Sequence, residues 1–238
     1  MIDIFFIRHG ATEGNLRRRY IGRTDEPLCE AGIAQVKALQ KRGLSVDRLF
    51  VSPMLRTRQT ADILFPKMPY TVVDGLIETD FGRFEGKSAD KLSGDPAYQA
   101  WVDAMCLTPI PEGESVTDFK TRCCEAFAET IKNVPDGSRV GFVVHAGGPQ
   151  GRPRSVHQIL IGDGHTVPPN QKSNGITAWD HQASAPFSWG RTSFRAWIAT
   201  SSMESSGSKV VKFCIQRPGA ARIFVNQLSW APTKWLIS

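Results

Sequence analysis

Residues 4–15 read IFFIRHGATEGN, and this stretch decides the fold. Its apolar beginning, 4–7, predicts a short buried strand. The strand runs directly into Arg8, His9 and Gly10. Arginine offers a planar fork of donors that fits phosphate oxygens, and glycine lets backbone N–H groups approach a bound anion closely. The end of this strand is therefore a candidate oxyanion site, although an ordinary strand-to-loop turn could carry the same three residues.

Strands and helices alternate along the first 145 residues. Strands are predicted at 2–7, 47–51, 70–73 and 139–144, and helices at 29–42, 56–65, parts of 89–105 and 115–132. This alternation predicts an α/β fold, a three-layer α/β/α sandwich with a mostly parallel central sheet. In such folds ligands bind at the carboxyl ends of the strands. Because His9, Arg56 and His145 all follow predicted strands, one site can collect them.

Five segments occur in the order typical of the histidine phosphatase superfamily, which the chain resembles over residues 1–148. They are RHGxTxxN at 8–15, SPMLRTRQTA at 52–61, LIETDFGRFEG at 76–86, PEGES at 111–115, and the strand 140–144 followed by His145. Any one of these segments alone is a weak signal, whereas the five together are specific. The resemblance implies a phosphoglycerate mutase-like fold for this part of the chain.

The resemblance also implies a chemistry, that of a phosphoric monoester hydrolase acting through a phosphohistidine. It assigns His9 as the nucleophile, Arg8, Arg56 and His145 as ligands of the phosphoryl oxygens, and Glu78 as the acid and base. Because arginine and imidazole supply the positive charge, we expect neither a metal nor another cofactor. Phosphoryl transfer depends chiefly on such positioning and charge stabilisation.

Two assignments have competitors within the same segments. Arg58 competes with Arg56, but the family spacing after Ser-Pro selects Arg56 and leaves Arg58 on the helix surface. Glu85 competes with Glu78, but it occupies the aromatic-Glu-Gly position, which we interpret as structural.

Substrate contacts are predicted from the resemblance and from position near the strand ends. The candidates are Asn15, Gly22, Arg23, Thr24, Glu114 and Ser115. The segment 22–28, GRTDEPL, is similar to the α-ribazole phosphatase and broad-specificity phosphatase branch. The interval of 67 residues between Glu78 and His145 leaves little room for the extra segment of phosphoglycerate mutases. We expect hydrolysis of a small phosphorylated metabolite, with α-ribazole 5′-phosphate a candidate. A mutase-type phosphoryl transfer and an impaired pseudoenzyme that binds phosphate remain alternatives.

Composition sets broad limits on the class of protein. Apolar residues make up 41% and charged residues 22% of the 238, which is ordinary for a globular protein. The apolar runs fall short of the roughly 20 residues of a membrane span, and the N-terminus lacks a signal-peptide pattern. The five cysteines are odd in number and form no Cys-x-x-Cys pair, so we expect reduced thiols and a cytoplasmic protein. The oligomeric state is left open.

The last 90 residues differ sharply from the rest in charge. Residues 1–148 contain 19 Lys and Arg against 20 Asp and Glu, whereas residues 149–238 contain 10 against 3. We treat 1–148 as the core and 149–238 as an atypical basic segment that completes the same domain if it folds. A divergent extension and an out-of-frame reading both explain that composition. Strands are predicted at 209–215 and 222–228, and 164–208 shows no sustained period. The positive charge forms no dense run, which disfavours a nucleic-acid partner.

Overall fold

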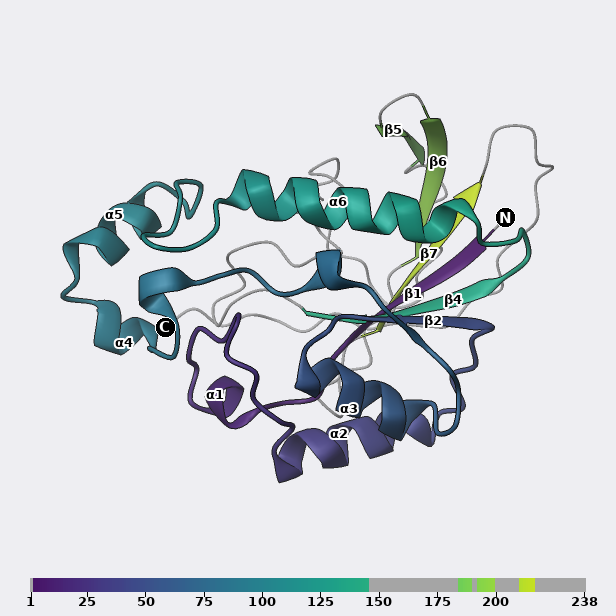
Figure 1. The fold of residues 1–238 in the computed structure, drawn as a ribbon, viewed down its shortest axis with the longest axis horizontal. Coiled ribbons are helices and arrows are strands. Elements are labelled where there is room, and N and C mark those ends of the chain that lie inside the picture. Colours follow the sequence, from purple (N-terminus) through teal and green to yellow (C-terminus); the bar gives the residue numbers. More distant parts are fainter. Residues whose placement is uncertain (1, 146–183, 190–191, 200–209, 217–238) are drawn as a thin grey trace, which may run out of the picture.

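The computed structural model describes residues 2–145, 184–189, 192–199 and 210–216, and it places one sheet between helices (Figure 1). The sheet has seven strands in the order β3-β2-β4-β1-β7-β6-β5. The strands are β1 (Ile2–Arg8), β2 (Arg48–Val51), β3 (Thr71–Val72), β4 (Arg139–Val144), β5 (Ser184–Trp189), β6 (Thr192–Ala199) and β7 (Val210–Gln216). The α-helices are α1 (Glu13–Leu16), α2 (Glu30–Gln40), α3 (Leu55–Leu64), α4 (Ala89–Leu92), α5 (Pro96–Asp103) and α6 (Val116–Lys132).

Neighbouring strands in the first half of the sheet are all parallel. β1 pairs with β4 so that Arg8 lies opposite Val144, and β4 pairs with β2 so that Val143 lies opposite Val51. β7 is antiparallel to β1, and β6 and β5 continue the sheet with antiparallel pairing. β1 to β4 and β6 therefore point the same way, which confirms the predicted mostly parallel sheet.

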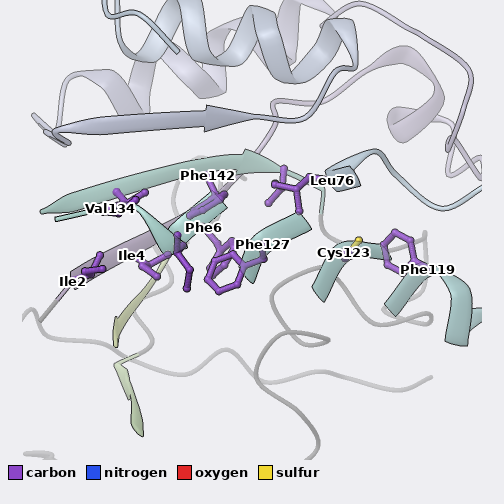
Figure 2. Packing of buried hydrophobic residues seen from close by; sticks show 12 residues of the cluster. Ile2, Ile4, Phe6, Leu76, Phe119, Cys123, Phe127, Val134 and Phe142 are labelled. Carbon is purple, nitrogen blue, oxygen red and sulfur yellow. The ribbon is translucent and has the colours of Figure 1, made fainter. Parts of the chain in front are cut away.

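The two faces of the sheet are covered by different helices, as the alternation of side chains along a strand requires. Ile2, Ile4 and Phe6 of β1 pack in the cluster formed with α6, whereas Phe5 and Ile7 pack in the cluster formed with α2 and α3. Figure 2 shows the first cluster from close by. Burying each of these side chains contributes about 1.5–3 kcal/mol. The predicted three-layer sandwich is confirmed.

Helix α6 forms where its apolar stripe and its cap predict it. Phe119, Cys123, Phe127 and Ile131 are buried at helical spacing against the sheet. Ser115 is the N-cap, and its hydroxyl accepts a hydrogen bond from the Asp118 N–H at 3.0 Å. The helix predicted at 115–132 is therefore confirmed as Val116–Lys132, with Ser115 as its cap.

Two differences from the sequence-based expectations concern local structure. Within 89–105 the sequence predicts helix breaks at Gly94 and Pro96, but Pro96 is the first residue of α5, where its missing N–H costs nothing and Asp95 caps the helix. β5 and β6 lie within 164–208, where no strand was expected, while β7 matches the strand predicted at 209–215. The strand predicted at 222–228 lies outside the described residues. None of the described helices is long and apolar enough to cross a bilayer.

Candidate active site

Polar side chains gather where three adjacent parallel strands end. His9, Ser52 and His145 each come directly after the last residue of β1, β2 and β4 respectively. The strand register brings them together, and the ring centroids of His9 and His145 lie 5.1 Å apart. The sheet therefore positions two imidazoles side by side at its carboxyl edge, as the sequence predicted.

His9 is held as a neutral imidazole with one nitrogen available. Its backbone N–H donates to the Val144 carbonyl at 3.1 Å, and its Nδ1 donates to the Gly10 carbonyl at 2.7 Å. With the hydrogen on Nδ1, Nε2 carries the free lone pair. Burial lowers the pKa of His9 well below its ordinary value, and the positive charges of Arg56 and Arg8 lower this pKa further. The Nε2 lone pair of the neutral ring is thus available to a bound group.

Gly10 allows the loop after His9 to lie directly against α2. A Cβ at this position would come within 2.6 Å of the Gly32 carbonyl oxygen and 2.8 Å of Val36. The Gly10 N–H donates to the Thr60 hydroxyl at 3.1 Å, which ties the same loop to α3. Any side chain at Gly10 would therefore push His9 away from its place at the sheet edge.

Arg56 is the second residue of α3, and only 1% of it is exposed. Its guanidinium donates to the Thr24 carbonyl at 3.0 Å and the Gly22 carbonyl at 2.9 Å. Burial lowers the pKa of Arg56, but an arginine remains charged in proteins. Arg58, two residues on, is exposed. The prediction that Arg58 lies on the helix surface is confirmed, and Arg56 is buried.

Glu78 is a buried carboxyl group, 6% exposed, at the same edge of the sheet. Its Oε1 accepts a hydrogen bond from the Thr79 N–H at 2.8 Å, and its Oε2 lies 4.0 Å from Nδ1 of His145. Burial raises the pKa of Glu78, against the opposing effects of the Thr79 hydrogen bond and the Arg56 and Arg8 charges. A carboxyl group with a raised pKa can hold a proton and donate it.

His145 is buried against Ser52, whose Oγ lies 2.7 Å from its Nε2. The other ring nitrogen, Nδ1, is buried and has no hydrogen-bond partner among the described residues. Burial, and after it the charge of Arg56, lowers the pKa of His145 well below its ordinary value. Ser52 was not among the predicted site residues, yet it follows a predicted strand directly, a feature that it shares with His9 and His145.

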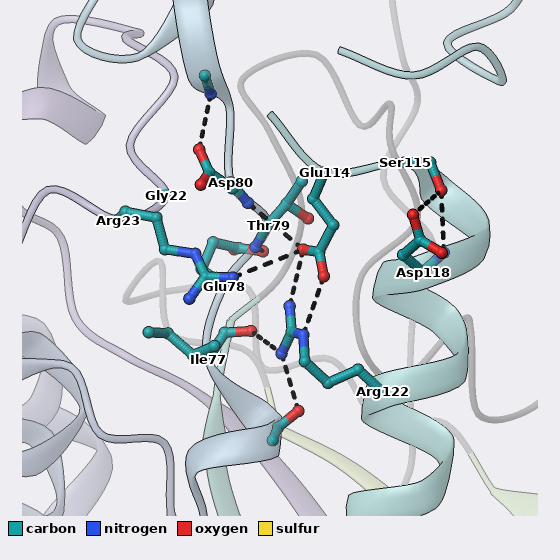
Figure 3. Close-up of polar contacts among 12 residues, drawn as sticks. Gly22, Arg23, Ile77, Glu78, Thr79, Asp80, Glu114, Ser115, Asp118 and Arg122 are labelled. Atoms are coloured by element: carbon teal, nitrogen blue, oxygen red, sulfur yellow. Dashed lines mark hydrogen bonds and ion pairs between the residues drawn. The ribbon is translucent and has the colours of Figure 1, made fainter. Parts of the chain in front are cut away.

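Arg122 of α6 braces the segment that leads into Glu78, as Figure 3 shows. Its guanidinium donates to both carboxylate oxygens of Glu114, at 2.9 and 2.8 Å. It also donates to the Gly75 carbonyl at 2.9 Å and the Ile77 carbonyl at 3.0 Å. The sequence analysis did not predict this role, because Gly75 and Ile77 lie 47 and 45 residues before Arg122 along the chain.

The predicted substrate contacts lie in several environments. Arg23 is exposed, and its guanidinium lies 3.9 Å from the Glu114 carboxylate. Asn15 forms a reciprocal capping box with Thr12 at the start of α1. Thr24 is exposed and Ser115 caps α6, whereas the Gly22 carbonyl binds Arg56. Their roles in binding substrate remain predictions.

The site as a whole combines an imidazole with an available nitrogen, two guanidinium groups, of which Arg56 is buried and Arg8 half-buried, and a protonatable carboxyl group. The positive charges of Arg8 and Arg56 both lower the pKa values of His9, Glu78 and His145. Within the described ranges, no three His, Cys, Asp or Glu side chains cluster as a metal-binding set. Two guanidinium groups around an available imidazole nitrogen suit a tetrahedral oxyanion that undergoes transfer.

Comparison with known proteins agrees with this geometry. The family model described as histidine phosphatase superfamily (branch 1) matches residues 4–149. A protein of Enterobacter sp. (strain 638) named probable phosphoglycerate mutase GpmB is 31% identical over 153 residues, which are 61% of this chain and 70% of that protein.

Two solved structures share the fold as well. The α-ribazole phosphatase of Shigella flexneri is 25% identical with a TM-score of 0.56, over 60% of this chain and 74% of that one. The phosphoserine phosphatase of Entamoeba histolytica, in complex with 3-phosphoglyceric acid, is 26% identical with a TM-score of 0.55, over 61% and 75%. The chain belongs to the histidine phosphatase superfamily, branch 1.

Proposed function

We propose that the protein hydrolyses phosphomonoesters of small metabolites through a phosphohistidine at His9, without a metal. The observation that carries the proposal is the hydrogen bond from His9 Nδ1 to the Gly10 carbonyl, which leaves Nε2 of the neutral ring unprotonated at a site with the buried Arg56 and the half-buried Arg8. A lone pair, fixed cations and a proton donor are the groups that phosphoryl transfer needs.

The first half of the reaction transfers the phosphoryl group to the enzyme. Nε2 of His9 attacks phosphorus, and the bond from phosphorus to the ester oxygen breaks. Arg8 and Arg56 neutralise charge on the equatorial oxygens, and Nδ1 of His145 donates to one of them. Glu78 gives its proton to the departing oxygen, so that an alcohol leaves and a carboxylate remains.

The second half returns the enzyme to its starting state. The Glu78 carboxylate takes a proton from a water molecule as the water oxygen attacks phosphorus. The phosphorus–nitrogen bond breaks, inorganic phosphate is released, and the electron pair returns to Nε2 of His9. Glu78 is again protonated, which its raised pKa favours.

The test is hydrolysis of an aryl phosphate by the full chain and by His9→Ala, without added metal. We expect turnover in the wild type, its loss in His9→Ala, and an acid-labile phosphoprotein that is seen only in the wild type. Arg58→Lys, a substitution at an exposed position, is the control and should hydrolyse the aryl phosphate at the wild-type rate. Undiminished turnover in folded His9→Ala would overturn the mechanism.

The resemblance to the Enterobacter protein favours a second candidate, transfer of the phosphoryl group between positions of phosphoglycerate. The two activities differ in what accepts the phosphoryl group from His9, a substrate hydroxyl or water. Incubation with 3-phosphoglycerate distinguishes them, since a mutase forms 2-phosphoglycerate and a phosphatase releases inorganic phosphate. Because the Shigella relative is an α-ribazole phosphatase, α-ribazole 5′-phosphate is the first natural ester to assay.

A further inference from the structure

A short exposed loop holds the guanidinium group of Arg56. The carbonyls of Gly22 and Thr24 accept hydrogen bonds from Nη2 and Nη1 of Arg56, at 2.9 and 3.0 Å, and the Ile21 carbonyl lies 3.5 Å from Nη2. Gly22 is buried, whereas Arg23 and Thr24 are exposed. The orientation of the Arg56 guanidinium therefore depends on the position of this loop, part of which is exposed to solvent.

The N–H groups of that loop are held by one carboxylate. Oε1 of Glu85 accepts from the Gly22 N–H at 2.7 Å and from the Thr24 N–H at 3.0 Å. The loop backbone thus lies between two opposite charges, with its N–H groups on Glu85 and its carbonyls on Arg56. Oε2 of Glu85 is buried and has no hydrogen-bond partner among the described residues.

Close packing keeps the loop within reach of Glu85. A Cβ at Gly22 would lie 1.9 Å from the Thr79 carbonyl oxygen and 3.1 Å from Oε2 of Glu85. Gly22 therefore packs directly against the segment that follows Glu78. This contact connects the loop that binds Arg56 with the segment that carries Glu78.

We propose that Glu85 is a positioning residue that orients the Arg56 guanidinium through the backbone of residues 22–24. This inference rests on the proposed function only in that Arg56 binds the phosphoryl group. Other contacts of the loop, from the Glu26 N–H to the Thr24 carbonyl and from the Leu55 N–H to the Asp25 carboxylate, hold its far end. Within the described part of the chain, the N–H groups of Gly22 and Thr24 both donate to the Glu85 carboxylate.

Three substitutions separate hydrogen bonding from charge. Glu85→Gln keeps a carbonyl oxygen at the position of Oε1 and removes the charge. Glu85→Asp keeps the charge but is one methylene too short for both N–H groups. Glu85→Ala removes both, and Glu125→Ala removes an exposed glutamate of α6 as the matched control.

The readouts are binding of inorganic phosphate by titration calorimetry, kcat and KM with an aryl phosphate, and the midpoint of thermal unfolding. We expect Glu85→Ala and Glu85→Asp to lose kcat by about 10²-fold, the size of effect that a displacement of about 1 Å has on a reacting group. Phosphate binding should weaken in both. Glu85→Gln should stay close to wild type in both readouts, as should Glu125→Ala.

Two results would overturn the proposal. One is a Glu85→Asp variant that matches the wild type while Glu85→Gln fails, which would make charge the decisive property. The other is unchanged phosphate affinity and kcat in Glu85→Ala. If Glu85→Ala does not fold, the Gln and Asp variants still decide the question. If the wild type hydrolyses no ester, the proposed function fails, and phosphate binding alone then tests Glu85.

Discussion

Replacing Glu78 with glutamine should slow ester hydrolysis by an amount that depends on the leaving group. Glutamine keeps an oxygen that can accept the Thr79 N–H, now 2.8 Å from Oε1, and it matches the neutral form that burial favours. What it lacks is the proton. General acid catalysis contributes about 10²–10⁴ in rate, which is about 2.7–5.4 kcal/mol of transition-state free energy.

The full loss should appear with an alkyl phosphate, because an alkoxide is a poor leaving group without a proton. A nitrophenyl phosphate should show little loss in its first step, because a nitrophenolate leaves unprotonated. Since Glu78 also serves as the base toward water, the variant should then release one equivalent of nitrophenol rapidly and accumulate phosphoprotein. The assay is rapid-quench kinetics with both esters.

The refuting result is an equal loss with the two esters and no burst, since that would assign Glu78 to phosphate binding or to structure. Stability provides the control. A carboxyl group whose pKa is raised in the folded state lowers the free energy of unfolding as the pH rises, because its ionised form is less stable when buried than in the unfolded chain. Glu78→Gln should therefore unfold no more easily than the wild type at pH 8, measured by urea denaturation.

Three further predictions concern the groups around Glu78. Arg56→Lys should lower kcat by about 10²–10³, because a lysine cannot hold both loop carbonyls and the phosphoryl group, while the exposed Arg58→Lys should leave aryl phosphate hydrolysis unchanged. Ser52→Ala should reduce kcat and leave a folded protein, and Ser52→Thr, which keeps the hydroxyl 2.7 Å from Nε2 of His145, should restore part of it. Urea denaturation should show stability falling below pH 6.5 by up to about 1.4 kcal/mol per pH unit for each of His9 and His145, since both bind protons more readily when unfolded; a His9→Asn variant that kept the wild-type slope would contradict this.

The sequence predicted the parts of the site whose signals are local. His9 and His145 were identified because each follows a predicted strand and lies in a segment typical of the histidine phosphatase superfamily, and α6 because its stripe repeats at helical spacing. Parallel pairing places the carboxyl ends of these strands at the same edge of the sheet, so their proximity could be predicted once the strands were predicted. The contact of Glu85 with Gly22 could not be predicted in this way, because the two residues are 63 positions apart and Glu85 binds a backbone N–H group, which any residue type provides.

Strands β5 and β6 were missed for a different reason. β5 reads SAPFSW and lies at the edge of the sheet, where only one side needs hydrogen-bond partners. A proline is tolerated in such a strand, but in the sequence it argues against strand structure. Antiparallel pairing of β6 with β7 follows from long-range partners that composition does not reveal.

Burial and the two arginine charges bear differently on the protonation states that the proposed mechanism needs at His9 and Glu78. At neutral pH a free carboxyl group is ionised, yet the mechanism needs a protonated Glu78 beside an unprotonated Nε2. Burial favours both states at once, because it disfavours the carboxylate and the imidazolium alike. Arg8 and Arg56 reinforce the neutral imidazole but oppose the neutral carboxyl group. When a phosphate dianion binds, it compensates the two guanidinium charges and removes that opposition. In the proposed mechanism, substrate binding would therefore raise the pKa of Glu78 further and favour its protonated form where a leaving group is present to receive the proton.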